Sequence, residues 1–185
     1  MNDLNLLYAS INPKFIKRTS KLFKQLVTFN PAEVYARINI EKFKRRQKLD
    51  IKELFPNTTT GYCACGCGMK LLGRQSRWAS RKCSDFPRHV QLILCGDSQL
   101  IKKIMMCYLP YECCKCHCKN YIISTAKSKV DGIQVDHVIA VKNGGGGCWL
   151  GNYQFICHTC HAKKTVIDNQ IRSMQSAMPV SIAFD

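Results

Sequence analysis

Residues able to carry out metal-assisted hydrolysis are concentrated in one short part of the chain. An Asp–His pair, Asp136-His137, is followed, beyond a run of glycines, by two further histidines, His158 and His161. A carboxylate and an imidazole together suit Mg²⁺, Mn²⁺ or Zn²⁺. A neutral imidazole, with an ordinary pKa of about 6.5, can take a proton from water near neutral pH. These residue types therefore indicate a site where a cation and a general base meet.

The surrounding sequence predicts how these residues would be positioned. The expected elements are a strand over 135–141, a glycine loop over 144–147, a second strand over 153–156 and a helix from 157 to about 170. In that helix, Ile167 and Ile171 are expected to face the core. Two strands followed by a helix would bring the Asp–His pair close to the two later histidines.

The ordered set of residues resembles the HNH nuclease family. The pattern Leu-x-Asn-x-x-x-x-Cys-x-x-Cys-His-x-x-Lys is met by Leu150, Asn152, Cys157, Cys160, His161 and Lys164. Together with Asp136-His137, the resemblance covers roughly residues 111–165. It implies a ββα-metal core, and thus an α+β fold.

The resemblance also implies a role for each residue. His137 would be the general base, and Asn152 would orient it. Asp136 and His161 would bind one divalent metal, with Mg²⁺ or Mn²⁺ expected and Zn²⁺ open, which would stabilise charge on the scissile phosphate. From its position on the helix, Lys164 is expected to face phosphate or solvent, and we predict that it contacts the nucleic acid.

Taken singly, these residues have ordinary explanations. An Asp–His pair in a strand is commonly a hydrogen-bonded surface pair, an asparagine often lies in a turn, and a histidine on a helix is often exposed. Their joint spacing, with a cysteine pair just before His161, favours the functional interpretation.

A structural zinc site is expected beside the catalytic residues. In HNH proteins that carry such a zinc, a C-x-x-C pair precedes the first catalytic strand and its partner pair lies on the final helix. The resemblance therefore assigns Cys113 and Cys116 with Cys157 and Cys160. Other candidates in the same stretch, Cys114, His117 and Cys118, leave the first pair ambiguous. Four thiolates would close the coordination sphere, so this zinc would be structural.

A second cysteine group lies earlier in the chain. Cys63, Cys65, Cys67 and Cys83, spaced by glycines, resemble a small zinc knuckle. That pattern usually has a cysteine where Ala79 stands, and His89 is an alternative ligand. Arg74 and Arg81 beside the knuckle suit contact with phosphate.

Composition points to a polyanionic partner. Lys and Arg number 28 against 12 Asp and Glu, giving a formal charge of +16. The chain stays strongly basic even if zinc–thiolate sites add negative charge, so DNA is the expected partner, with RNA less favoured. Nine of the 13 cysteines fall in tight C-x-C and C-x-x-C clusters, which favours metal over disulfides. With no signal peptide and no long apolar run, we expect a soluble intracellular protein without membrane contact.

Three regions are expected along the chain. Residues 1–56 form a basic helical region whose Lys44, Arg45 and Arg46 would contact DNA. Residues 57–96 hold the zinc knuckle, and residues 97–185 form the nuclease domain. The sequence thus predicts a metal-dependent HNH endonuclease. The alternative is a non-catalytic zinc-finger protein that binds nucleic acid, which would have no need of the Asp136, His137, Asn152 and His161 set.

Overall fold

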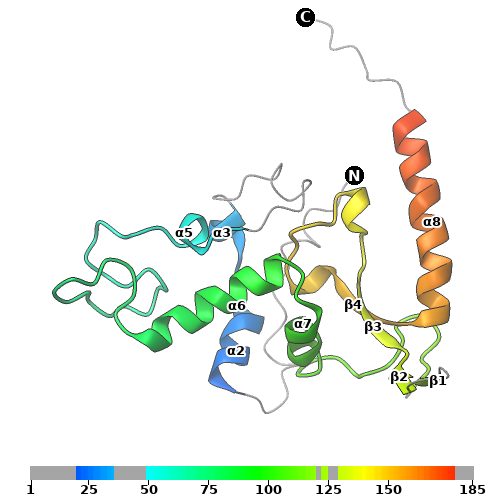
Figure 1. Ribbon diagram of the computed structural model, residues 1–185, viewed down its shortest axis with the longest axis horizontal. Helices are drawn as coiled ribbons and strands as arrows, with labels where there is room; N and C mark the ends of the chain where they lie inside the picture. Colours follow the sequence, from blue (N-terminus) through cyan, green and yellow to red (C-terminus); the bar gives the residue numbers. More distant parts are fainter. Residues whose placement is uncertain (1–19, 36–48, 120–121, 125–128, 178–185) are drawn as a thin grey trace, which may run out of the picture. The chain divides into compact units, whose positions relative to one another are not determined.

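The computed structural model describes residues 20–35, 49–119, 122–124 and 129–177 (Figure 1). The cations expected to contact DNA at Lys44, Arg45 and Arg46 lie outside these residues. The chain forms two compact units. Unit 1 comprises 1–110 and 146–153, and unit 2 comprises 111–145 and 154–185.

Unit 1 is helical in its described part. Its elements are α2 (Lys21–Thr28), α3 (Ala32–Tyr35), α5 (Ile51–Leu54), the 3₁₀ turn η2 (Arg81–Ser84), α6 (Asp85–Leu94), α7 (Ser98–Met105) and the 3₁₀ turn η4 (Leu150–Asn152). Side-chain caps begin several of them. Ser20 accepts from the Phe23 amide at the start of α2, and Asp97 accepts from the Leu100 amide at the start of α7.

Helix α6 is the centre of the unit 1 core. It contacts α2, α5, η2 and α7, and its Val90 and Ile93 are fully buried. Phe29 stacks edge-on against Phe86 of α6 and against Trp149, with ring centroids 5.1 Å and 5.6 Å apart. Two described helices of the expected basic region, α2 and α5, therefore share a core with α6, the helix that follows the cysteine knuckle.

The strands described belong to unit 2, apart from Tyr153, the first residue of β4, which belongs to unit 1. The strands β1 (Ile122–Ser124) and β2 (Lys129–Asp131) pair antiparallel, with Ile123 opposite Val130. The strands β3 (Ile133–His137) and β4 (Tyr153–Cys157) form a second two-stranded sheet. Between β3 and the glycine run lies the 3₁₀ turn η3 (Val141–Asn143), and Gly144 follows it with φ +94°. This mixture of helices with small sheets agrees with the α+β class.

Helix α8 (His158–Ala177) follows β4 without an intervening loop (Figure 1). The His158 amide donates to the Gly132 carbonyl at 2.9 Å, which ties the start of the helix to the start of β3. Asn143 of η3 donates to the Asp168 carbonyl at 3.1 Å, which holds the middle of the helix. The strand, strand and helix therefore form one connected assembly.

One expectation about α8 is wrong. Ile167 and Ile171, expected to face the core, are 56% and 40% exposed, and Val166 and Met174 are also exposed. The helix contacts β3 and η3, with His161 and Lys164 directed at Asp136 of β3 and the Asp168 carbonyl accepting from Asn143 of η3. The side of α8 that packs is thus its polar side.

None of the described helices is both long enough and apolar enough to cross a lipid bilayer.

Candidate metal and catalytic site

Asp136 and His161 lie together in unit 2, as the sequence predicted. Asp136 Oδ1 is 3.7 Å from His161 Nε2. Asp136 is near the end of β3 and His161 is in the first turn of α8, so the contact depends on the helix beginning directly at the end of β4. The Asp136 side chain is largely buried, whereas His161 keeps about a third of its surface open to solvent. A carboxylate and an imidazole in this arrangement offer two ligands to one cation, with room for water.

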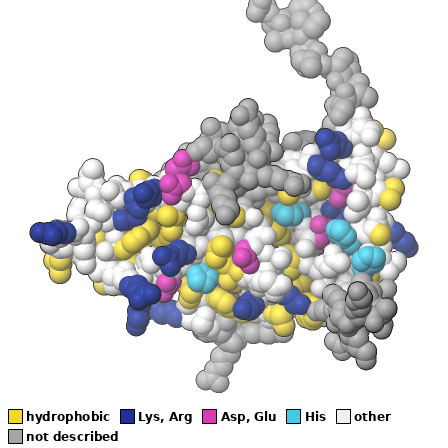
Figure 2. Space-filling view, in the orientation of Figure 1, with side chains coloured by type: hydrophobic (Ala, Val, Ile, Leu, Met, Phe, Trp, Pro, Cys, Tyr) yellow, Lys and Arg dark blue, Asp and Glu magenta, His cyan; other side chains and the backbone are white. Residues whose placement is uncertain are grey.

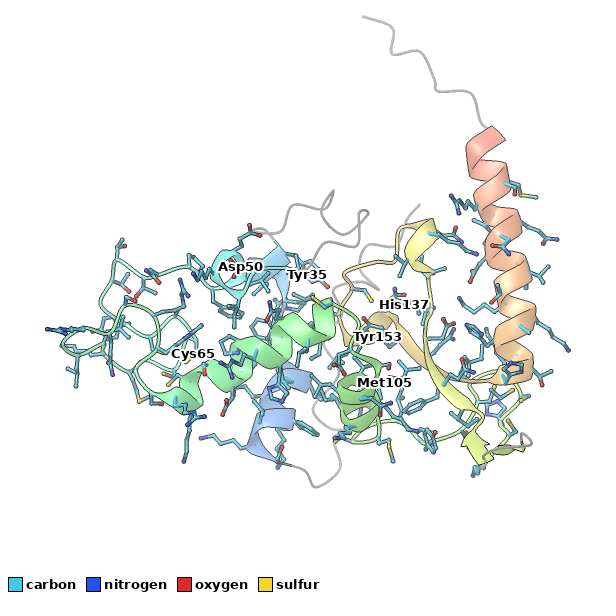
Figure 3. The ribbon with its side chains drawn as sticks, in the orientation of Figure 1. Tyr35, Asp50, Cys65, Met105, His137 and Tyr153 are labelled. Atoms are coloured by element: carbon cyan, nitrogen blue, oxygen red, sulfur yellow. The ribbon has the colours of Figure 1, made fainter. Side chains whose placement is uncertain are left out.

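His137, the residue after Asp136, ends β3 and is labelled in Figure 3. Burial lowers its pKa below the ordinary value, with the nearby Lys164 acting in the same direction and the Asp136 carboxylate acting against it. A lowered pKa keeps the imidazole neutral near neutral pH. His137 is thus able to accept a proton.

Gln154 of β4 holds the Asp–His pair from the neighbouring strand. Its Nε2 donates to Asp136 Oδ2 and to the His137 carbonyl, both at 3.3 Å. Its Oε1 accepts from Cys114 Sγ at 3.1 Å. This buried amide was not among the residues expected from the sequence. The only signal was one polar residue at the start of an apolar strand.

Two further side chains complete the surroundings of Asp136. Lys164 Nζ lies 3.2 Å from Asp136 Oδ2 and 2.6 Å from Asp168 Oδ2. Burial opposes the charge of Lys164, but the bonds to Asp168 and Asp136 hold its pKa above the ordinary value. Lys164 was expected to contact nucleic acid, and in this structure it is bound to two carboxylates. Asp168 was missed, although its place four residues after Lys164 on a helix is typical of an ion pair. The acidic, basic and histidine side chains over α8 are visible on the right of Figure 2.

Asn152 belongs to unit 1, where it closes the turn η4. It is fully buried, its amide donates to the Trp149 carbonyl at 3.0 Å, and its side chain bonds to the Cys148 thiol. Its expected role in orienting His137 stays a prediction.

Four cysteines of unit 2 form a group that could hold a metal ion such as zinc. The Sγ atoms of Cys113, Cys116, Cys118 and Cys157 all lie within 4.8 Å of one another. Cys116 and Cys157 sulfurs are 3.7 Å apart. Sulfurs bound at about 2.3 Å around a tetrahedral zinc are separated by about 3.8 Å, so this spacing suits zinc.

Backbone N–H groups stabilise the thiolate form of cysteines in this group. Burial opposes ionisation of Cys113, but amides from Cys157, Cys116 and Lys115 hold its pKa at about 6. The Cys160 amide donates to Cys157 Sγ at 3.4 Å. Such donors stabilise thiolates, the form that binds metal.

The sequence left open which residues of the first cysteine cluster would bind zinc. The contacts of Cys114, His117 and Cys118 reduce the choice. Cys114 donates to Gln154, and His117 lies 3.4 Å from Glu112, so neither is directed at the group. Cys118 lies within it. Cys160, expected as the fourth ligand, is a fifth thiol beside the group and bonds to Cys157, Cys116 and Cys113.

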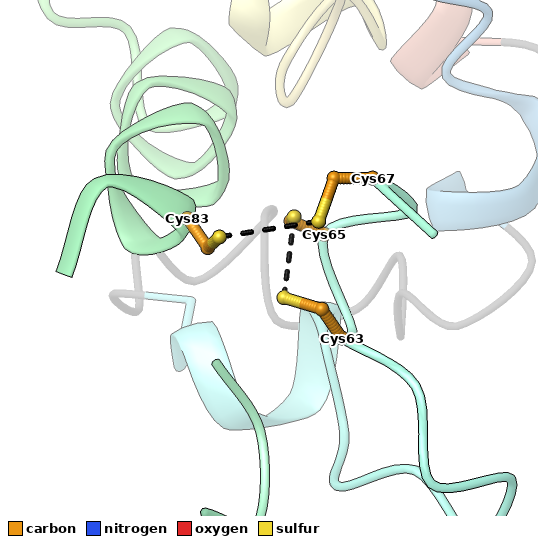
Figure 4. Close-up of side chains that lie close together, drawn as sticks. All are labelled: Cys63, Cys65, Cys67 and Cys83. Carbon is orange, nitrogen blue, oxygen red and sulfur yellow. Dashed lines mark hydrogen bonds between the residues drawn. The ribbon is translucent and has the colours of Figure 1, made fainter. Parts of the chain in front are cut away.

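The cysteines of unit 1 also form a group that could hold a metal ion. The Sγ atoms of Cys63, Cys65, Cys67 and Cys83 lie within 4.8 Å of one another (Figure 4). The sulfurs of Cys63 and Cys65 are 3.3 Å apart, and those of Cys67 and Cys83 are 3.9 Å apart. Cys83 thus supplies the fourth thiol.

The residues around this group explain two departures from the expected knuckle. Ala79, which stands where a cysteine is usual, donates its amide to Cys63 Sγ at 3.3 Å. His89, the alternative ligand, bonds instead to the Asp85 carbonyl at 2.7 Å. Arg74 and Arg81 are both exposed, as phosphate contact requires.

A surface cavity of about 430 Å³ opens beside Asp136 in unit 2. Its wall is formed by Lys115, Val138, Gln154, Cys160, Lys163, Lys164, Ile167 and Asp168. Two residues of this wall, Gln154 and Lys164, contact Asp136, whereas Asp136, His137 and His161 do not line the cavity. Three lysines against one aspartate, Asp168, give its wall a net positive charge.

No family model, curated protein or solved structure matches this chain.

Proposed function

We propose that unit 2 is a metal-dependent nuclease of the HNH, ββα-metal type that hydrolyses phosphodiester bonds in DNA. The observation that carries the proposal is the approach of Asp136 and His161 to 3.7 Å beside a half-buried His137 whose pKa is lowered. The order of two paired strands and a helix supports the same core.

Each residue has a definite part in this reaction. His137 takes a proton from the attacking water, because its imidazole is neutral near neutral pH. Asp136 and His161 hold one divalent cation, Mg²⁺ or Mn²⁺, which supplies charge stabilisation at the scissile phosphate. Gln154 fixes the Asp136 carboxylate and the backbone of His137 through its two donated bonds.

The cavity supports a nucleic acid as substrate. Lys115 and Lys163 are exposed at its wall, where a phosphate backbone would meet positive charge. The formal charge of +16 for the whole chain favours the same partner. Zinc on the cysteine group would hold the end of β4 against the segment before β1, and so support a small core.

A second function has a specific observation in its favour. The two cysteine groups could each hold a structural metal, which would suit a zinc-containing protein that binds nucleic acid without cutting it. The discriminating feature is His137, since a binding protein gains nothing from a half-buried neutral base beside a carboxylate.

Cleavage of supercoiled plasmid tests the proposal. With Mg²⁺ or Mn²⁺ we expect nicked or linear product, and with EDTA none. Binding without cleavage under every divalent cation, in protein that retains its zinc, would favour the second function.

A further inference from the structure

The ammonium of Lys164 lies so close to Asp136 that a divalent cation bound there would be repelled by it. Its ammonium lies 3.2 Å from Asp136 Oδ2, while Asp136 Oδ1 faces His161 at 3.7 Å. A cation bound between Asp136 and His161 would thus stand only a few ångströms from the ammonium. Two like charges at that distance in a partly dry site repel strongly.

Asp168 provides a second carboxylate that binds the ammonium of Lys164. Its Oδ2 is 2.6 Å from Lys164 Nζ, and it lies one helical turn further along α8. A lysine carries its charge on a flexible four-carbon stem. Lys164 can therefore leave Asp136 and stay bound to Asp168 without any movement of the helix.

The net charge of Asp136, Lys164 and Asp168 also favours the binding of a further cation. Asp136, Lys164 and Asp168 are 16%, 14% and 13% exposed, so their charges are poorly screened by water. Two carboxylates share one ammonium, which leaves one negative charge uncompensated. The exposed Lys163 and Lys115 lie on the cavity wall, where phosphate is expected.

We propose that Lys164 is a resident cation that occupies Asp136 until a divalent metal displaces it, and that Asp168 is the positioning residue that receives its ammonium. The inference rests on the proposed function, because it concerns the metal of that site. Two consequences follow. The site is held together before metal binds, and metal binding frees Lys164 to face the phosphate beside it.

Mn²⁺ binding to the full-length, zinc-loaded protein tests this without any cleavage step. Free Mn²⁺ is measured by electron paramagnetic resonance as the ion is titrated. Lys164→Met removes the competitor, so Mn²⁺ affinity should rise about tenfold, within the range of couplings between two ligands. Asp168→Asn leaves the ammonium on Asp136 alone, so affinity should fall about fivefold. Asp168→Glu should restore most of that loss.

Lys163→Met is the matched control. It removes the same charge from the adjacent residue, which is exposed and contacts neither carboxylate in the described structure, and its affinity should stay within about twofold of the parent. If Lys164→Met loses zinc or helix content, Lys164→Gln replaces it with the same expected rise. An unchanged or weaker affinity in a folded Lys164 variant overturns the inference, as does a rise of equal size in Lys163→Met.

Asp136→Asn separates failure of this inference from failure of the proposed function. If Asp136→Asn abolishes Mn²⁺ binding while the Lys164 variant matches the parent, the metal site stands and only the displacement is wrong. If the parent and Asp136→Asn bind Mn²⁺ equally weakly, the metal of the proposed function is wrong and the inference falls with it.

Discussion

Gln154 donates to Asp136 Oδ2 at 3.3 Å, and the same side chain accepts from Cys114, the neighbour of Cys113 in the cysteine group. One amide thus connects the candidate catalytic carboxylate to the segment that would bind zinc. Loss of a residue that orients a metal ligand typically costs 10–100-fold in affinity or activity. We expect Gln154→Leu to lower cleavage by about tenfold and to keep its zinc.

Gln170→Leu, an exposed change on α8, is the control for that variant. Cleavage is measured as the initial rate of plasmid nicking, and zinc by mass spectrometry of the metal. A parent-like rate in Gln154→Leu would mean that Asp136 is oriented without the amide.

The general base is tested by His137→Ala. Loss of such a base costs about 10²–10⁴ in rate, whereas one neutral imidazole adds little to backbone affinity. We expect DNA binding to stay within a few-fold of the parent. His158→Ala is the matched control, because His158 is an exposed histidine at the start of α8, and it should cut at the parent rate. Equal cleavage rates for His137→Ala and His158→Ala would mean that His137 is not the general base.

Two tightly bound zinc ions are expected in the intact protein, one for each cysteine group. Cys83→Ser should lose the zinc of unit 1 and Cys157→Ser that of unit 2, each leaving one equivalent after dialysis. Cys107→Ser changes a thiol outside both groups and should keep two. Metal content and thermal unfolding give the result, and a well-folded protein without zinc would contradict it.

Cys118 and Cys160 compete for the fourth position in the unit 2 group. Because Cys118 lies within the 4.8 Å group, we expect Cys118→Ser to lose zinc to a chelating dye faster than Cys160→Ser. The reverse order would assign the fourth bond to Cys160, the residue expected from the sequence.

The lysines of the cavity should contribute to the salt dependence of DNA binding. Each phosphate neutralised adds about −0.9 to the slope of log affinity against log salt. In a His137→Ala background, Lys115→Gln with Lys163→Gln should make the slope shallower by about 1.8. Lys82→Gln with Lys103→Gln, also exposed but on unit 1, is the control of equal charge. An equal decrease of the slope in both double variants would mean that DNA binding depends only on the net charge of the protein.

Local chemistry in the sequence predicted much of unit 2. The β-branched run around Asp136, the glycine run and the cysteine pair led to two strands and a helix, and the structure has β3, β4 and α8 in those places. The contact of Asp136 with His161 followed from that order. The strand ends at His137 rather than at 141, because Val141 begins the turn η3.

Other features depend on contacts that a single sequence does not specify. Ile167 was expected in the core because an apolar residue is usually on the packed side of a helix, but here ion pairs through Lys164 decide which side packs. The sequence led to Cys160 as the partner of Cys157, but the backbone path at His117, with φ +56°, brings Cys118 into the group in its place. Gln154 acts through three partners far from it in sequence.

The absence of a linker between β4 and α8 fixes the rotation of the helix about its own axis. Cys157 ends the strand, and His161, Lys164 and Asp168 follow at intervals that keep them on one side. Each residue of an α-helix turns by about 100°. A single residue inserted after Cys160 would therefore swing all three side chains away from Asp136 together, while every one of them remained in the chain. In this protein the site depends on angular register as much as on composition, and one added residue would be more damaging than many substitutions.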